Sequence, residues 1–595
     1  MSSLIFQAID WLVTDYSEYN EDELDSIKIK YLIKIFGRNM EGEHISINIK
    51  NYPTFFYIKG IDDLPGVKGI NNLNDGSHNN IINNLRNYIE YNLPKKYKNS
   101  IKCCKISRKK DLWGFNNNIP FKFIYLSFTN FRAMKIASNL FLKKISFGPY
   151  NIKFKLYENN IEPYLRFVHK QDLQISGWLQ VADSKYNVTD EFNVKKGKTY
   201  NVNWKDVKPY QSTNIAPFII GSFDIECNSY DGSFPCAIKT YDSFVHGLLD
   251  YHNLLNNEIK QIKQDKIFKY ILDTLQNKSL NFKQELNIDK ITDKLEIQIE
   301  DILSILKGKL QFEKESIKRN KIRNLSAYFE FENKLEEGDD LSSSEIVEKL
   351  VEKFTNFLPP LNGDPVIQIG TTFHKYGAKE CFKKIIVTLD TCSDIPGSIV
   401  ISCKTEKELI QKWVEIINEI DPDVLTGYNI LGFDFNYLYH RSMELNCVEY
   451  FCNLGKLREP ISECEMDDEG YCKKHWVKKC LSSSALGDNF LKYISTEGRV
   501  VIDLMKEVQK NFNLDTYKLD NVASHFINGN VKKIQNENDK MKLYLDNPIG
   551  IQKNNYIKLD GAKYFIDEIN YNDNSIIIKT DYDIFDKNIN YKKWG

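Results

Sequence analysis

The segment FIIGSFDIE, residues 218–226, decides the fold of the central part of this chain. It is an apolar run that ends in acidic residues, which is typical of a buried strand. Side chains alternate along a strand, so Asp224 and Glu226 share one face and Ile225 points to the other. Two carboxylates on one face suit a divalent cation such as Mg²⁺, which prefers oxygen ligands. Taken alone, the same pattern also describes an ordinary solvated strand end.

A second acidic segment, DPDVLTGYNILGFD, occupies residues 421–434. Residues 424–426 predict a short buried strand, and a helix is expected to begin near Phe433. Asp434 then lies at a helix N-terminus, where the helix dipole favours a carboxylate. A helix-start residue without further function is the alternative interpretation of Asp434.

The sequence between the two segments connects them into one sheet. Residues 363–377 alternate as a strand does, and residues 383–417 predict a strand, a loop, a second strand and a helix. A carboxylate-bearing strand, further strands, a helix and then a strand leading to another carboxylate are typical of a ribonuclease-H-like nuclease. We therefore predict an α/β, ribonuclease-H-like domain.

On both sides of this core, the composition and the hydrophobic pattern of the sequence change at several points. Its 595 residues are enough for several domains. Residues 237–360 are helical in pattern and highly charged, which predicts an inserted helical module, and the last segment predicts short strands with Asn, Gly and Asp turns. The predicted domains are a mixed N-terminal domain (1–215), a nuclease domain (216–236 and 361–530), a helical insertion (237–360) and a β-rich segment (531–595).

Composition excludes several classes of protein. The chain is 42% hydrophobic and carries a net charge of −1, so a nucleic-acid surface must be a local patch. No run of eighteen apolar residues and no secretory pattern at the start are present, which predicts reduced thiols in the cytoplasm or nucleus, no secretion and no membrane contact. No phosphate-binding G-x-x-x-x-G-K-[ST] loop indicates an ATP-driven motor.

These motifs resemble those of family B DNA polymerases. GSFDIEC resembles the first exonuclease motif of that family, and residues 421–441 resemble the second. Residues 157–178 and 482–527 are similar to flanking stretches of eukaryotic polymerase delta and of its relatives in large DNA viruses. The resemblance covers residues 150–235 and 360–595 well, and the insertion does not share it.

The resemblance implies a role for each matching residue in two-metal 3′–5′ proofreading. Asp224 would bridge two Mg²⁺ or Mn²⁺ ions, Glu226 would hold one of them, and Asp434 would support the second, partly through water. Asn429 and Phe433 would line the track of the frayed primer 3′ end. Stacking of a base on an aromatic ring is tolerant of sequence, which suits a proofreader. Core packing is the alternative interpretation of Phe433.

The third exonuclease motif of the family, Tyr-x-x-x-Asp on a helix, has no clear match. Local matches at Tyr556/Asp560 and Tyr582/Asp586 fall in strand-and-turn sequence, and Asp520 is a further weak candidate. The polymerase motifs of the palm are also absent. We therefore expect the N-terminal and exonuclease region of a replicative polymerase, either as a fragment or as the product of a split gene.

The partners implied by the resemblance are a primer–template with its single-stranded 3′ end and a chain or region carrying the palm. A sliding clamp is a further partner that it allows. A catalytically inactive DNA-binding half that docks on a palm-bearing chain, and a stand-alone exonuclease, are alternatives. The sequence also offers a possible zinc site at Cys464, Cys472, His475 and Cys480. A structural zinc site normally has two closely spaced pairs of ligands, and only one close pair is present here, so a hairpin with reduced thiols is favoured.

Overall fold

The structure is a computed structural model of the whole chain. The residues that it describes are 3–19, 27–60, 76–111, 117–147, 150–229, 232–242, 348, 351–352, 361–378, 380–459, 476–483, 487–537, 540–548, 550–551, 553–559, 562–579 and 593–594. Most of the predicted helical insertion lies outside the described residues. So do the zinc candidates Cys464, Cys472 and His475, and the side chain of Cys480.

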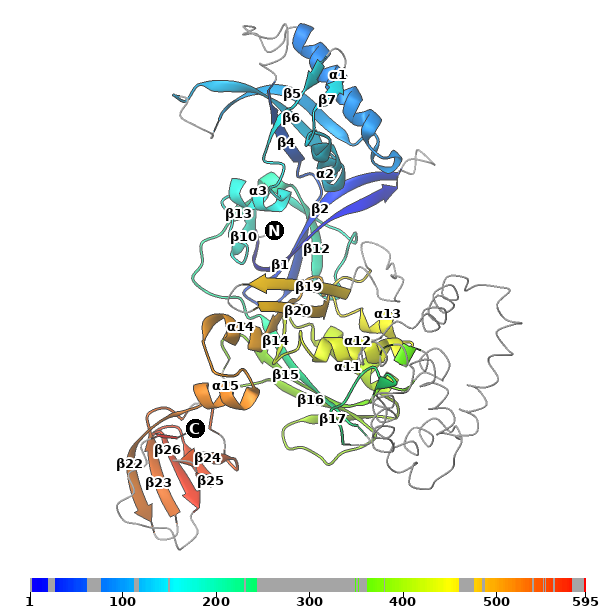
Figure 1. The fold of residues 1–595 in the computed structure, drawn as a ribbon. Coiled ribbons are helices and arrows are strands. Elements are labelled where there is room, and N and C mark those ends of the chain that lie inside the picture. Colours follow the sequence, from blue (N-terminus) through cyan, green and yellow to red (C-terminus); the bar gives the residue numbers. More distant parts are fainter. Residues whose placement is uncertain are drawn as a thin grey trace, which may run out of the picture.

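A six-stranded mixed sheet forms the centre of the molecule (Figure 1). Its order is β17-β16-β15-β14-β18-β21. Strand β15 runs antiparallel to both of its neighbours, and the other pairings are parallel. This is a ribonuclease-H-like arrangement, as predicted. The bounds are β14 (Ile219–Cys227), β15 (Val366–Lys375), β16 (Lys383–Leu389), β17 (Ile399–Cys403), β18 (Val424–Gly427) and β21 (Val500–Asp503).

Helices α11 (Glu406–Ile420), α12 (Asp434–Glu444) and the short α13 (Val448–Phe451) share one hydrophobic core with this sheet. Trp413 of α11 is fully buried. Its ring lies 5.0 Å from that of Phe223, and its indole N–H donates to Thr371 Oγ1 at 3.0 Å. The strand that carries the first acidic pair therefore rests on a well-packed layer.

The N-terminal region contains two further sheets. A seven-stranded sheet has the order β11-β12-β3-β2-β1-β10-β13, and a four-stranded sheet has the order β5-β6-β4-β9. The first consists of β1 (Leu4–Tyr19), β2 (Ile27–Arg38), β3 (His44–Ile49), β10 (Trp178–Val181), β11 (Tyr186–Val188), β12 (Lys198–Val202) and β13 (Val207–Pro209).

The four-stranded sheet packs with helices α1 and α2 around a separate core. Within it, strand β6 leads directly into the amphipathic helix α2. The remaining elements of this region are β4 (Thr54–Lys59), α1 (Gly76–Asn92), η2 (Lys95–Tyr97), β5 (Ile101–Lys110), β6 (Pro120–Phe128), α2 (Phe131–Leu140), β7 (Ile145–Phe147), β8 (Tyr150–Ile152), β9 (Lys155–Tyr157), α3 (Pro163–Lys170) and η3 (Trp204–Asp206).

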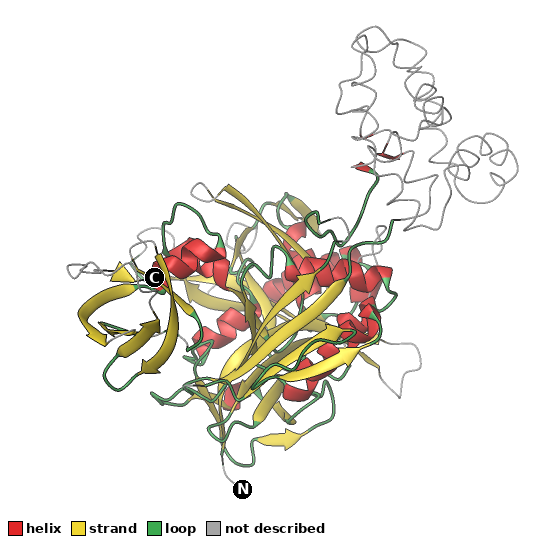
Figure 2. Ribbon diagram, turned by 90° about the horizontal axis from the view of Figure 1, so that it is seen from below, coloured by secondary structure: helices red, strands yellow, loops and turns green. Residues whose placement is uncertain are grey.

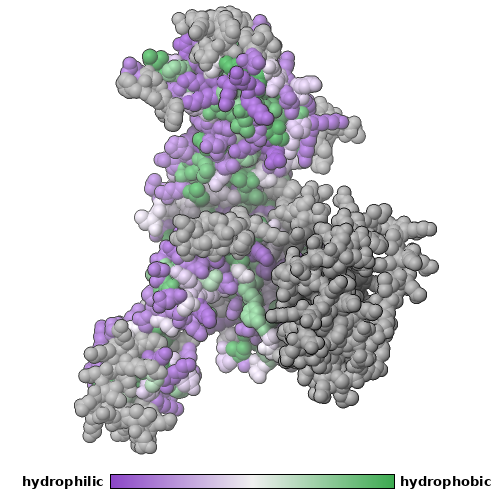
Figure 3. All heavy atoms as spheres, in the orientation of Figure 1, coloured by the Kyte–Doolittle hydropathy of each residue, from purple (hydrophilic) through white to green (hydrophobic). Residues whose placement is uncertain are grey.

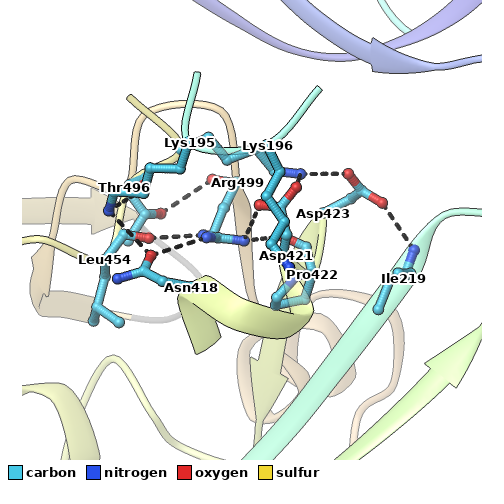
Figure 4. Close-up of polar contacts among 12 residues, drawn as sticks. Lys195, Lys196, Ile219, Asn418, Asp421, Pro422, Asp423, Leu454, Thr496 and Arg499 are labelled. Carbon is cyan, nitrogen blue, oxygen red and sulfur yellow. Dashed lines mark hydrogen bonds and ion pairs between the residues drawn. The ribbon is translucent and has the colours of Figure 1, made fainter. Parts of the chain in front are cut away.

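Buried charges join the N-terminal sheet to the central sheet. Figure 4 shows Asp421, Asp423 and Arg499 of this cluster. Asp423 forms an ion pair with Arg38 of β2 and another with Lys456, whose Nζ lies 2.7 Å from Asp423 Oδ1. Its Oδ2 also accepts from the backbone N–H of Ile219 at 2.8 Å, at the start of β14. Neighbouring Asp421 pairs with Arg499 at 2.9 Å. These two acidic residues of the second segment therefore serve the domain interface.

The charges around Asp423 outweigh the cost of its burial. Burial raises the pKa of an aspartate, but the positive charges of Lys456 and Arg38 together hold the pKa of Asp423 below its ordinary value. Asp423 therefore stays ionised at neutral pH, and each charge of the cluster depends on the others for compensation.

The chain beyond the nuclease sheet folds into a closed barrel with the order β22-β23-β26-β25-β24-β27. Figure 2 shows these strands as a unit beside the main body. Strands were predicted here, but closure of the barrel was not. The bounds of this part are β19 (Trp476–Ser483), β20 (Gly487–Ile494), α14 (Leu504–Asn511), α15 (Leu519–Phe526), β22 (Gly529–Glu537), β23 (Lys540–Leu545), β24 (Tyr556–Leu559), β25 (Ala562–Asn570), β26 (Ser575–Lys579) and β27 (Lys593–Trp594).

In the described parts of the chain, no helix is both long and apolar enough to cross a membrane. Nine cysteines in these parts are free thiols.

Candidate functional site

One pocket of about 890 Å³ collects all five residues singled out from the sequence. Its volume lies in the upper part of the range of ligand-binding pockets. The walls come from the end of β14, the loop between β18 and α12, and the loop between α14 and α15. The lining residues are Asp224, Ile225, Glu226, Cys227, Phe234, Pro235, Tyr428, Asn429, Phe433, Asp434, Met505, Thr516, Tyr517, Lys518 and Leu519.

The end of β14 places both of its carboxylates on the pocket side. Phe223 and Ile225 are buried, whereas Asp224 and Glu226 are exposed, so the side chains alternate as the sequence predicts. Strand β18 pairs with β14 only as far as Ser222. Beyond that residue this edge of β14 has no strand beside it, which leaves room for side chains from the α12 end.

Asp434 is the first residue of α12 and is almost completely buried. Burial and the nearby negative charge of Asp224 raise the pKa of Asp434 to about 7, although the backbone N–H of Ile225 opposes the shift. Desolvation also raises the pKa of the Asp224 carboxyl group, whereas the neighbouring carboxyl group of Asp434 lowers it. The two carboxyl groups thus lie next to each other, and the negative charge of Asp224 disfavours ionisation of Asp434.

A bound cation would favour the ionised form of both carboxyl groups. Asp434 Oδ1 is buried and has no hydrogen-bond partner in the described structure. An unpaired buried carboxylate oxygen beside a second carboxylate is the donor chemistry that Mg²⁺ or Mn²⁺ requires. The residues therefore fit a divalent cation at Asp224 and Asp434. Within the described residues, no group of three His, Cys, Asp or Glu side chains is already arranged around a common point.

The loop between β18 and α12 has a fixed backbone. Asn429 takes a left-handed conformation with φ of 62°, and its carbonyl oxygen accepts from the N–H groups of Gly432 and Phe433, each at 2.9 Å. A Cβ at Gly432 would come within 2.3 Å of Asn429 Oδ1, so any other residue there would push the Asn429 side chain out of its place. This tight turn presents Asn429 and Phe433 to the pocket just before Asp434.

Asp503, which sequence reasoning missed, holds this loop in place. It ends β21 and is buried. Its Oδ1 accepts from the backbone N–H of Asn429 at 3.0 Å and of Met505 at 2.9 Å, and its Oδ2 accepts from Leu431 N–H at 3.0 Å. One carboxylate thus fixes the loop between β18 and α12 and caps α14. The aspartate that follows an apolar strand and precedes a helix was the available signal.

Replacing Asp503 by Ala is expected to loosen the loop. Three backbone N–H groups would lose their acceptor, and each buried unsatisfied group costs about 1–3 kcal/mol. Amide hydrogen exchange at Asn429 and Leu431 should therefore become at least roughly tenfold faster, since about 1.4 kcal/mol of lost local stability already gives that factor. The exposed Asp515→Asn, in the neighbouring loop, serves as the control. Unchanged exchange in Asp503→Ala would show that the loop is held by other contacts.

Aromatic residues from distant segments complete the pocket. The ring of Phe234, which is 75% exposed, lies 5.7 Å from that of Phe433 at 63°. The hydroxyl of Tyr428 donates to the carbonyl of Tyr517 at 2.5 Å, which ties the two loops together. Exposed Lys518 adds a positive charge to the wall. The sequence carried no local signal for these contributions, because each depends on a contact between segments.

Among the described residues, the candidates for the third motif do not line this pocket. Asp520 is exposed on α15, and Tyr556 is exposed on a strand of the barrel. Asp560 and the Tyr582/Asp586 match lie outside the described residues.

Comparison with known proteins identifies the domain around this pocket. Residues 154–266 and 348–522 match the model of the DNA polymerase family B exonuclease domain. The pocket residues from Asp224 to Leu519 all fall within this match.

The similar proteins are polymerases of viruses and of eukaryotes. The chain is 38% identical to a DNA polymerase of Pyramimonas orientalis virus, over 97% of this chain and 46% of that protein. It is 26% identical to a DNA polymerase of Phaeocystis pouchetii virus, over 92% and 58% of the two chains. A segment of 169 residues is 38% identical to the DNA polymerase delta catalytic subunit of Dictyostelium discoideum.

Among solved structures, the family B DNA polymerase of Pyrobaculum calidifontis aligns over 88% of this chain and 39% of that one, with 13% identity and a TM-score of 0.41. The chain spans about half the length of the two viral relatives. Its sequence matches agree on one family. The matched residues of this chain belong to the exonuclease domain of DNA polymerase family B.

Proposed function

We propose that this chain is the part of a replicative DNA polymerase that removes nucleotides from the 3′ end of DNA. The contact between Asp224 and Asp434, in a pocket within the matched exonuclease domain, carries the proposal. Glu226 lines the same pocket and adds a third carboxylate. Two divalent ions, when bound, would activate water and stabilise the leaving oxygen in phosphodiester hydrolysis.

The residues of the chain have distinct tasks in this proposal. Asp224 and Asp434 would hold one ion between them, and Glu226 would hold the other together with Asp224. Burial of Asp434 excludes water from one side of the pair, which strengthens its attraction for a cation. The hydrogen-bonded turn at Asn429 keeps Asp434 at the required place.

The aromatic pair at Phe234 and Phe433 suits an unpaired base. The two rings lie edge to face, and Phe234 is largely exposed. A base of a frayed strand can stack on such a ring with about 1–3 kcal/mol, whereas a base inside a duplex is already stacked. The pocket would thus favour a mispaired 3′ end. The side chain of Asn429 would bond to the same end, and Lys518 would attract its phosphate.

The proposal is tested on a primer–template with a mismatched 3′ end. The chain is expected to shorten a 5′-labelled primer stepwise in Mg²⁺ or Mn²⁺ and to do nothing in EDTA. The reaction should be slow, because the third exonuclease motif has no match at the pocket and two ions held close together need several carboxylates. With nucleotides present, no extension is expected. Cleavage inside the strand or from the 5′ end would contradict the proposal.

The second candidate is a DNA-binding half without activity of its own, which docks on a palm-bearing chain. It is favoured by the lack of three converging ligands within the described residues. Primer binding with no shortening after long incubation would support it. Degradation restored by a palm-bearing chain would show that the pocket is competent but incomplete.

A further inference from the structure

A row of cationic and aromatic side chains crosses the outer face of the C-terminal barrel. Lys540 of β23 lies opposite Lys579 of β26, and Tyr556 of β24 lies opposite Phe565 of β25. Lys579 Nζ lies 5.9 Å from the centre of the Phe565 ring, which connects the two pairs. The row therefore continues over four adjacent strands. It lies outside the residues matched by the exonuclease domain.

This row faces solvent because the barrel interior is filled by other residues. The inward side chains are aliphatic or methionine and are almost completely buried; they are Met541, Leu543, Leu545, Ile551, Ile557, Leu559, Ile566, Ile576 and Ile578. Side chains alternate along a strand, so the lysines and rings between these positions point outward. In Figure 3 the described surface of the barrel is mainly hydrophilic.

The lysines of this face oppose one another across neighbouring strands, although Lys542 is paired with Asp573 at 3.2 Å. Lys540 faces Lys579, and Lys558 faces Lys563, directly across neighbouring strands. Like charges in such pairs destabilise a sheet. Asp567 compensates the first pair, with its carboxylate 2.7 Å from Lys540 and 3.7 Å from Lys579. One carboxylate shared by two lysines still leaves a positive charge.

The rings of this face are accessible. Tyr556 is 63% exposed, and its ring lies 5.6 Å from that of Phe565 at 74°. Tyr544, four residues along β23 from Lys540 and on the same face, has Lys533 and Lys542 at 5.5 and 5.1 Å from its ring centre. Lysines interleaved with exposed rings are the combination that binds single strands, since the lysines attract phosphates and the rings stack on unpaired bases.

We propose that the outer face of β23, β26, β25 and β24 is a binding surface for single-stranded DNA. Paired bases of a duplex are already stacked, so exposed rings favour a single strand. The surface is separate from the exonuclease pocket and goes beyond the proposed nuclease activity. It gives the chain a second hold on an unpaired strand.

The test is fluorescence anisotropy of a labelled 20-nucleotide single strand with the full chain in EDTA, so that no degradation occurs. Tyr556→Ser/Lys558→Gln/Lys563→Gln is expected to bind about tenfold more weakly, the factor that the loss of one stacked base gives. The slope of log affinity against log salt should become shallower by roughly 1.4, since each phosphate contact on a single strand contributes about 0.7.

The matched control likewise removes one tyrosine and two lysines, at a site in the N-terminal region. Tyr91→Ser/Lys95→Gln/Lys96→Gln lies at the end of α1 and in η2, where Tyr91 is 84% exposed. It should bind as the parent does. Lys563→Gln alone relieves a like-charge pair, so it should keep its melting temperature and still lower the salt slope by about 0.7. This variant decides the matter if the triple variant fails to fold.

Unchanged affinity of the triple variant, or an equal loss in the control, would overturn the proposal. So would tighter binding of duplex DNA or of single-stranded RNA than of the single DNA strand. Because binding is measured without metal, these outcomes are independent of whether the nuclease proposal holds.

Discussion

Asp224→Asn is expected to lower the rate of DNA degradation at least about a thousandfold, since the charge stabilisation by a metal ion is worth several kcal/mol and each 1.36 kcal/mol is a factor of ten. The amide keeps the size of the side chain but removes its negative charge. The measurement is the shortening of a 5′-labelled mismatched primer in Mn²⁺. The exposed Asp394→Asn, in a loop of the same domain, should keep the parent rate.

Stability separates this effect from unfolding. In the metal-free protein, the negative charge of Asp224 disfavours ionisation of Asp434. Asp224→Asn removes that repulsion, so its free energy of unfolding without metal should equal or exceed that of the parent. A variant that is inactive and as stable as the parent supports a functional charge. A variant that degrades DNA normally would show that the pocket is not the nuclease site.

Asp423→Ala is expected to lower the free energy of unfolding by about 3–5 kcal/mol, because removing one partner of a buried ion pair leaves the others uncompensated. Arg38 and Lys456 would both lose a carboxylate, and Ile219 N–H would lose its acceptor. The measurement is denaturant unfolding, with limited proteolysis of the junction between β2 and the nuclease sheet. Proteolysis there should become faster.

A surface pair gives the matched control. Glu415 lies 3.0 Å from Lys412 on α11, and both side chains are roughly half exposed. Glu415→Ala should therefore cost at most about 1 kcal/mol. Equal effects of the two substitutions would show that the buried cluster does not join the domains as argued.

The local pattern of the sequence was sufficient to predict the centre of the fold. Alternation in residues 218–226 correctly placed Asp224 and Glu226 on one face, because a strand has a fixed period of two. The strands and the helix between residues 363 and 420 were also predicted correctly, since each has a clear apolar period and a turn at its ends.

Long-range contacts were beyond this kind of prediction. Asp421, Asp423 and Asp434 stand in one acidic segment, yet only Asp434 reaches the pocket. The other two pair with residues such as Arg38, which precedes Asp423 by 385 positions. Phe234 and Tyr517 likewise join the pocket through contacts between segments. Closure of the barrel depends on pairing of β22 with the distant β27, which no local pattern encodes.

Strand β1 shows a different reason for failure. It is 16 residues long, but a register shift between Ala8 and Asp10 interrupts the two-residue alternation of its side chains. Alternation therefore did not reveal it.

A crystal structure of the chain with Mn²⁺ tests the central claim most directly. We predict anomalous density for Mn²⁺ between Asp224 and Asp434, at about the 2.1 Å from carboxylate oxygens that is typical of a small divalent cation, and its loss in Asp224→Asn. Each of the two carboxyl groups should then bind the ion instead of contacting the other. Mn²⁺ bound elsewhere, with no ion between Asp224 and Asp434, would contradict the claim that this pair is a metal site.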